Sequence, residues 1–338
     1  MANRVNIKSV NKLTVTFLVD NTIEWMTKLP PGFIHEVPQH LAHPDVPRDP
    51  RTGVPIVDLE NYCCGAHGFS ALIQTEREGA PSYYTLFDTG PDSRSIIRNI
   101  DALKPPLDRI DRVVLSHWHS DHSGGLLSFL QHRRAHVPAD APPVVADLHP
   151  DRPIARGIAP PRIGKTHAEG HAVAGDTVWV SGEIPRVTHF EGGLPGAVRW
   201  VEGDGKGEWV KEEVKISNCA VSLDGGSRAS LVCSHAGIVN VVKDAVDRFS
   251  RPIYMIIGGL HLAGSDLIDR IPPTVDFLAS KLRPSPTYVL PMHCSGFAAK
   301  VALEEAFGEG CVPAGVGHKV IVEGSPEADN MMHGATYQ

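Results

Sequence analysis

The sequence predicts an α/β fold of the α+β kind, in which β-sheets are covered by helices. Short apolar runs with the period of strands recur along the chain, and amphipathic stretches with helical period lie between them. The composition agrees with this, since 42% of the 338 residues are hydrophobic and 21% are charged. A chain of this length and composition can bury a substantial core.

Ten segments have the length and composition of strands. They are 13–19, 69–74, 83–88, 112–116, 178–180, 215–223, 229–233, 253–257, 288–291 and 319–322. Gly-Ala-Pro at 79–81 separates the second segment from the third, and Asp-Gly-Gly at 224–226 separates the sixth from the seventh. Each of these two pairs is therefore predicted to form a hairpin.

Five segments have helical periodicity, and they alternate with the strands. They are 93–103, 123–136, 238–249, 274–282 and 297–307. In the first of them Ile96, Ile100 and Leu103 share one face, and Ser93 is predicted to cap the N-terminus.

We interpret residues 1–338 as a single domain with proline-rich insertions near 29–60 and 138–170. Each insertion contains seven prolines within its first 27 residues, so neither can form regular structure over its whole length. Long loops of this kind are often lids or binding loops, but an inert insertion explains the pattern equally well.

The charge and cysteine content exclude several classes of function. The net charge is −7, from 32 basic and 39 acidic residues, and no basic block is present, which disfavours nucleic acid as a partner. Six cysteines in so long a chain do not form a disulfide scaffold. The N-terminus lacks an apolar leader, and no apolar run reaches the ~20 residues that span a membrane. We expect a cytoplasmic protein with a small-molecule substrate, and its oligomeric state stays open.

Histidine is unusually frequent, and one cluster stands out among the 18. His117, His119, Asp121 and His122 follow a predicted strand and precede a predicted helix. His117 and His119 alternate along the chain and can hold one metal ion, while Asp121 and His122 can hold a second. Imidazole and carboxylate ligands suit zinc, and they also suit iron or manganese. The glycines at 124–125 let the helix approach the site closely.

Two metal ions need further ligands from elsewhere in the chain. His235, His261 and His293 each follow a predicted strand and have small residues beside them, although each could equally be structural. Asp88 also closes a strand and could fix the tautomer of a liganding imidazole, or it could be a turn residue. Apart from His67, we assign the remaining histidines to surface or loop positions: His35, His40, His43, His132, His136, His149, His167, His171, His189, His318 and His333.

The cluster resembles the signature of a known family. Ser-His-Trp-His-Ser-Asp-His-Ser-Gly-Gly at 116–125 is similar to the His-x-His-x-Asp-His motif of the metallo-β-lactamase superfamily, and Phe-Asp-Thr-Gly at 87–90 matches its preceding strand end. More narrowly, the chain resembles the branch of dihydropterin–ribofuranosylaminobenzene-phosphate synthase-like metal-dependent hydrolases. The matching motifs lie at 18–21, 66–70, 181–185, 233–240, 258–262 and 293–296.

The resemblance implies a four-layer αββα sandwich with metal ions, expected to be two zinc ions, in a groove at one edge of the sheets. The resemblance also implies a role for each site residue. One metal ion would be bound by His117, His119 and His235, and the second by Asp121, His122 and His293. Asp121 and His261 would be catalytic, His67, Asn21 and Cys294 would bind substrate, and Asp88 and Cys233 would support the metal ligands. Many members also supply a carboxylate that bridges the metals from a late strand.

The corresponding strand end here, 231–235, contains no Asp or Glu. This departure leaves open whether Cys233, His235 or His261 faces the metals, and it leaves a one-metal site possible. The expected function is hydrolysis of an ester, thioester, lactone or phosphoester by metal-activated water. Three alternatives remain: a pterin-type condensation that releases pyrophosphate, a mononuclear iron redox enzyme, and a non-catalytic ligand-binding protein of the same fold.

Overall fold

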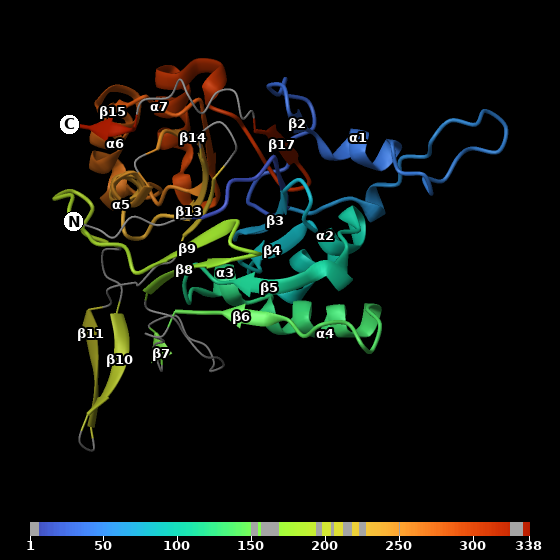
Figure 1. The fold of residues 1–338 in the computed structure, drawn as a ribbon, viewed down its shortest axis with the longest axis horizontal. Helices are drawn as coiled ribbons and strands as arrows, with labels where there is room; N and C mark the ends of the chain where they lie inside the picture. Colours follow the sequence, from blue (N-terminus) through green and yellow to red (C-terminus); the bar gives the residue numbers. More distant parts are fainter. Residues whose placement is uncertain are drawn as a thin grey trace.

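The computed structural model describes residues 7–149, 155–156, 169–193, 198–203, 206–211, 218–222, 228–249, 251–324 and 334–338. Two large β-sheets lie face to face, and helices cover the outer face of each (Figure 1). This is the predicted four-layer αββα architecture.

The first sheet has seven strands in the order β2-β17-β1-β3-β4-β5-β6. Their bounds are β1 (Lys12–Val19), β2 (Phe33–Ile34), β3 (Ser70–Glu76), β4 (Tyr83–Phe87), β5 (Ile110–Val114), β6 (Val145–Asp147) and β17 (Lys319–Glu323). Strands β3 and β4 form the predicted antiparallel hairpin, whereas β4, β5 and β6 run parallel to one another. The carboxyl ends of β4 and β5 therefore meet at one edge of this sheet.

The second sheet has six strands in the order β16-β14-β13-β12-β9-β8. Their bounds are β8 (Glu169–Val173), β9 (Val178–Gly182), β12 (Cys219–Ser222), β13 (Arg228–Cys233), β14 (Ile253–Gly259) and β16 (Tyr288–Met292). Strands β13, β14 and β16 are parallel, so the segments that follow them also leave the sheet at a common edge. The antiparallel pairing of β12 with β13 agrees with the second predicted hairpin, although its turn at 224–226 lies outside the described residues.

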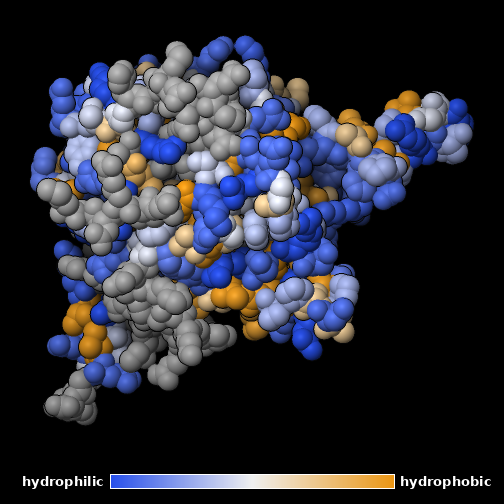
Figure 2. All heavy atoms as spheres, in the orientation of Figure 1, coloured by the Kyte–Doolittle hydropathy of each residue, from blue (hydrophilic) through white to orange (hydrophobic). Residues whose placement is uncertain are grey.

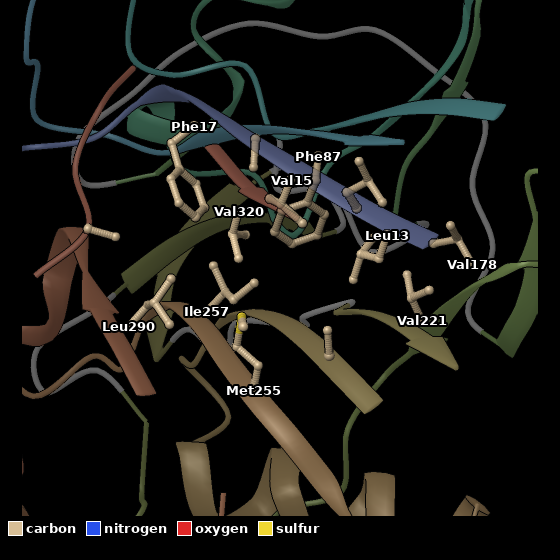
Figure 3. Close-up of a cluster of buried hydrophobic side chains, with 14 of the residues drawn as sticks. Leu13, Val15, Phe17, Phe87, Val178, Val221, Met255, Ile257, Leu290 and Val320 are labelled. Atoms are coloured by element: carbon tan, nitrogen blue, oxygen red, sulfur yellow. The ribbon is translucent and has the colours of Figure 1, made fainter. Parts of the chain in front are cut away.

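The hydrophobic core fills the space between the two sheets. Leu13, Val15 and Phe17 alternate along β1 and are fully buried, and they face Met255 and Ile257 of β14 (Figure 3). Alternation along a strand points every second side chain to the same face, which explains the pattern seen in the sequence.

Two further apolar clusters attach the helices to the sheets. One joins α2 and α4 to the first sheet, and the other joins α5, α6 and α7 to the second. The helices are α1 (Glu36–Leu41), α2 (Ser93–Leu103), α3 (Ser120–Ser123), α4 (Leu126–His136), α5 (Ile238–Phe249), α6 (Ile271–Asp276) and α7 (Phe297–Phe307). A π-helical segment (Phe277–Lys281) continues α6 through the predicted helix 274–282.

Smaller elements lie at the periphery. They are β7 (Ala155–Arg156), β10 (Val198–Gly203), β11 (Lys206–Lys211), β15 (Leu282–Arg283) and β18 (Thr336–Tyr337). The first proline-rich insertion contains β2 and α1 and then an arm, residues 42–58, that projects from the body (Figure 1). The surface of this arm is hydrophilic with apolar patches (Figure 2). Val54 and Ile56 of the arm are exposed. Among the described residues no helix is long and apolar enough to cross a membrane.

Three local predictions need correction. The cap of α2 is Asp92, whose carboxylate accepts hydrogen bonds from the backbone N–H groups of Arg94 and Ser95, whereas Ser93 is the first helical residue. The predicted helix 123–136 is divided into α3 and α4. Among the histidines predicted at surface or loop positions, His149 and His318 are loop residues, but both are buried.

The division between α3 and α4 falls at two glycines that are packed against backbone. A Cβ atom at Gly124 would lie 1.9 Å from the carbonyl oxygen of Pro91, and one at Gly125 would lie 2.2 Å from that of Thr89. Backbone atoms cannot rotate away as a side chain can. These glycines therefore allow the histidine-rich turn to approach the end of β4.

We expect Gly124→Ala to lower the free energy of unfolding by about 1–3 kcal/mol, the usual cost of overpacking a well-packed site. Chemical denaturation of the purified variant measures this change. Gly192→Ala is the matched control, because a Cβ atom there meets nothing within 4 Å. Equal stability of the two variants would show that the approach to Pro91 is not tight.

Candidate metal centre

The ends of five strands bring the predicted site residues together. Asp88 follows β4, and His117, His119 and His122 follow β5 in the first sheet; in the second sheet His235, His261 and His293 follow β13, β14 and β16. Parallel strands release their carboxyl ends at one edge of a sheet, and the sandwich brings the two edges together. Residues that are separated by up to 205 positions, from Asp88 to His293, thus surround one site.

The first group consists of His117, His119 and His235. One ring nitrogen from each lies within 4.8 Å of the others, which is close enough for the three imidazoles to hold one ion. Their ring centroids are 4.4 Å apart for His117 and His119 and 4.5 Å apart for each of these with His235. His117 and His235 are buried and His119 is half-buried, so the group lies at the base of the site.

The second group consists of Asp121, His122 and His293. The two Nε2 atoms are 3.1 Å apart, and Oδ2 of Asp121 lies 3.2 Å from Nε2 of His293 and 3.7 Å from that of His122. The pKa of Asp121 is lowered to about 2 when no ion is bound: burial raises it, but a hydrogen bond from His293 and the charges of His122 and His293, in their protonated forms, outweigh burial. The ring centroids of His117 and His122 are 4.3 Å apart, so the two groups are adjacent.

Asp88 orients one imidazole in each group. Its Oδ2 accepts a hydrogen bond from Nδ1–H of His122 at 2.7 Å and another from the Ser116 hydroxyl at 2.7 Å. Because the hydroxyl proton of Ser116 is directed to this carboxylate, its oxygen accepts from Nδ1–H of His117, at 2.8 Å. Both rings therefore keep their Nε2 lone pairs for the site, which is the arrangement that metal-binding histidines need.

Asn21 plays the same part for His293. The backbone N–H of Gly68 donates to Oδ1 of Asn21 at 3.2 Å, which identifies this atom as the oxygen, and Nδ1–H of His293 donates to the same oxygen at 3.1 Å. The amide nitrogen of Asn21 then faces Nδ1 of His67 at 3.1 Å, so His67 accepts there and carries its proton on Nε2. Nε2 of His67 lies 3.8 Å from Oδ2 of Asp121.

His261 lies beside the first group. Its ring centroid is 3.9 Å from that of His235, and its backbone has a positive φ of 54°. Both ring nitrogens are buried, and neither has a hydrogen-bond partner among the described residues. Two buried ring nitrogens without a partner are costly, which indicates that a ligand or ion belongs next to them.

The other two predicted residues have different positions. Cys294 is half-buried, and its Sγ atom packs against Gly259, where an added Cβ atom would lie only 2.6 Å from it. Its carbonyl oxygen accepts the backbone N–H groups of Leu262 and Ala263, so it supports the loop that carries His261. The backbone of Cys233 ends β13, but its side chain lies outside the described residues.

The donor chemistry of the second group fits a metal ion. The Nδ1 protons of His122 and His293 are committed to Asp88 and Asn21, so the two neutral rings point lone pairs at each other across 3.1 Å, next to the Asp121 carboxylate. Three facing acceptors repel one another unless a cation lies between them. His67 also reaches this group, with a ligand atom within 4.8 Å of those of Asp121 and His293, but its proton on Nε2 favours donation over metal binding.

Two supporting residues have no counterpart in the sequence analysis. The Ser116 hydroxyl donates to Asp88 and accepts from the His117 ring, so it links these two side chains. The fully buried Asp20 accepts hydrogen bonds from the backbone N–H groups of His293 and Thr22, each at 2.8 Å. Asp20 follows β1 as Asp88 follows β4, so a polar residue directly after a buried strand was the available signal.

Comparison with known proteins finds similarity to the family that the histidine motif resembles. A profile of the metallo-β-lactamase superfamily matches residues 67–210. The 7,8-dihydropterin-6-methyl-4-(β-D-ribofuranosyl)-aminobenzene-5'-phosphate synthase of Methanocaldococcus jannaschii is 29% identical over 267 residues, which are 72% of this chain and 85% of that protein. An uncharacterized protein of the same organism is 29% identical over 251 residues, 71% of this chain and 88% of that protein.

A solved structure supports the fold independently. The metal-dependent hydrolase of the β-lactamase superfamily Tm1679 superimposes with a TM-score of 0.54 over 92% of this chain and 99% of that chain, at 19% sequence identity. The αββα sandwich, the sequence motif after β5 and these likenesses agree with one another, and residues 67–210 match the metallo-β-lactamase superfamily.

Proposed function

We propose that the chain is a metal-dependent hydrolase that binds two metal ions, most simply zinc, and cleaves an ester, thioester, lactone or phosphoester of a small molecule. The observation that carries the proposal is the presence of two adjacent donor groups, His117, His119 and His235 in one and Asp121, His122 and His293 in the other. Nitrogen ligands with one carboxylate suit zinc, and iron or manganese can also use them.

Metal ions in such a site make water a nucleophile at neutral pH and polarise the substrate oxygen. The chain supplies the rest. Asp121 is ionised, because its pKa is held at about 2, so it can both bind metal and accept a hydrogen bond from the attacking water. Asp88 and Asn21 hold the liganding rings in the required tautomers.

His67 and His261 are placed to act on the substrate. The side chain of His67 is 73% exposed, and its Nε2–H group lies 3.8 Å from Oδ2 of Asp121, where it can donate a hydrogen bond to a leaving group. His261 presents two ring nitrogens without protein partners next to His235, where it can orient a substrate oxygen.

A transferase activity is the second candidate, and a specific observation favours it. The dihydropterin synthase of Methanocaldococcus jannaschii matches 72% of this chain and 85% of its own length at 29% identity. The same donor groups could hold a diphosphate leaving group, because metal ions attract phosphate oxygens.

A substrate screen separates the two candidates. We expect purified wild-type protein to hydrolyse at least one of a p-nitrophenyl ester, an acyl thioester, a lactone and bis(p-nitrophenyl) phosphate, and Asp121→Ala to lower that rate by about 100-fold or more. Asp45→Ala, in an exposed loop, is the control. Pyrophosphate release that requires both a dihydropterin methyl diphosphate and an aminobenzene ribofuranosyl phosphate, with no hydrolysis, would assign the transferase instead.

Metal content tests whether the two groups are separate sites. We expect His235→Ala and His293→Ala each to lose about one of two bound equivalents, because they belong to different groups, and the double variant to lose both. Elemental analysis with an absorption spectrum gives the stoichiometry and identifies the metal. If either single variant loses all metal, the site is mononuclear; iron with a visible absorption band would favour a redox enzyme.

Replacing the orienting carboxylate tests the tautomer argument. In Asp88→Asn the amide nitrogen replaces either Oδ2, where it faces both Nδ1–H of His122 and the Ser116 hydroxyl, or Oδ1, where it faces the backbone N–H of Ser116. In each case a donor meets a donor, so the hydrogen bonds that orient the rings are disturbed. We expect metal affinity, measured by competition with a chelator, to fall about 10–100-fold. Ser116→Ala removes only the link to His117 and should have a smaller effect. Wild-type affinity in Asp88→Asn would contradict the argument.

A further inference from the structure

A cavity lies apart from the candidate metal centre. Its volume is about 730 Å³, within the range of small-molecule sites, and none of the proposed metal ligands lines it. Its walls come from Thr22, residues 27–31, one face of α7 and residues 308–314. The beginning of the first proline-rich insertion thus has a definite place in the structure, as one wall of this cavity.

The walls are mainly apolar and rigid. Leu29, Pro30 and Pro31 form one side and Val312 and Pro313 form another. Prolines have few conformations to lose when a ligand binds, so such walls are preorganised. Cys311 adds to the apolar surface, because burial and the charge of Glu304 raise the pKa of its thiol to about 11 and keep it neutral.

One charged group in the cavity forms no ion pair among the described residues, although its charge acts on the buried Asp20 carboxylate and lowers the pKa of that group against the effect of burial. Lys300 of α7 is half-buried, and its ammonium group has one polar contact, the Thr22 hydroxyl at 3.4 Å. Glu304 follows one helical turn later, yet no carboxylate among the described residues lies within ion-pair distance of Lys300. Glu309, the other acidic residue of the lining, is highly exposed and pairs with Lys28 at 3.4 Å.

We propose that this cavity binds a small amphipathic carboxylate, with its anionic end at Lys300 and Thr22 and its hydrocarbon body against the proline and valine walls. Burial of the hydrocarbon body contributes about 25 cal/mol of favourable binding free energy for each Å² of apolar surface that is removed from water. A carboxylate supplies the partner that the Lys300 ammonium group lacks and accepts the Thr22 hydroxyl hydrogen bond. The site is independent of the proposed hydrolysis, because it uses none of the metal-binding residues.

Calorimetric titration of the metal-loaded protein with octanoate, octanol and octylammonium tests the proposal. We expect octanoate to bind one site per chain, at least about tenfold more tightly than octanol, and octylammonium not to bind. Tighter binding of octylammonium would assign the cavity to cations through Glu304 and overturn the proposal, as would the absence of saturable octanoate binding.

Variants locate the binding. Lys300→Met should lower the affinity for octanoate to that for octanol and leave octanol binding unchanged, which also shows that the cavity is still folded. Val301→Trp should abolish binding of both ligands, because Val301 lines the cavity from the partly exposed face of α7. Lys281→Met, which removes an exposed lysine outside the cavity, is the matched control. Unchanged octanoate binding in Lys300→Met or Val301→Trp would overturn the proposal.

Discussion

The hydrogen bonds of the Asp88 carboxylate are the constraint on which the site depends. This fully buried group accepts from the backbone and hydroxyl of Ser116 and from the His122 ring, at 2.7 Å in each case. It therefore ties the end of β4 to the turn after β5 and orients rings in both donor groups. A buried carboxylate is costly unless its oxygens are paired, and here the chain pairs them with the groups that must be held in place.

The sandwich supplies the other half of the site. His235, His261 and His293 follow three adjacent parallel strands, so their positions are set by strand order and not by sequence spacing. Close packing of the two sheets through the Leu13, Val15 and Phe17 face of β1 fixes the distance between the edges. The metal centre is thus as rigid as the core behind it.

The sequence predicted the parts that local patterns determine. The bounds of α2, α5 and α7 follow from apolar periodicity, and the turn after β5 reveals four ligand candidates because they are adjacent in the chain. Contacts between distant segments carry no such pattern. The link from Asn21 to His293 and His67, and the burial of His318 between loops, depend on tertiary packing. The Asp92 cap was hidden because Ser93, next to it, is an equally good capping residue.

The charge of the donor set has a consequence for the substrate. Asp121 is the only carboxylate in the two groups, and the strand end at 231–235 supplies no second one. Two divalent ions, if held as proposed by neutral imidazoles and one carboxylate, would keep a net positive charge, which Asp88 would offset only in part through His122. A positive, partly buried site favours anionic substrates even in a chain of net charge −7. Among the proposed substrates, a phosphoester satisfies this requirement better than a neutral ester or lactone. A diphosphate leaving group satisfies it as well. Hydrolysis and condensation must therefore be distinguished by their products and not by the affinity of the site for phosphate.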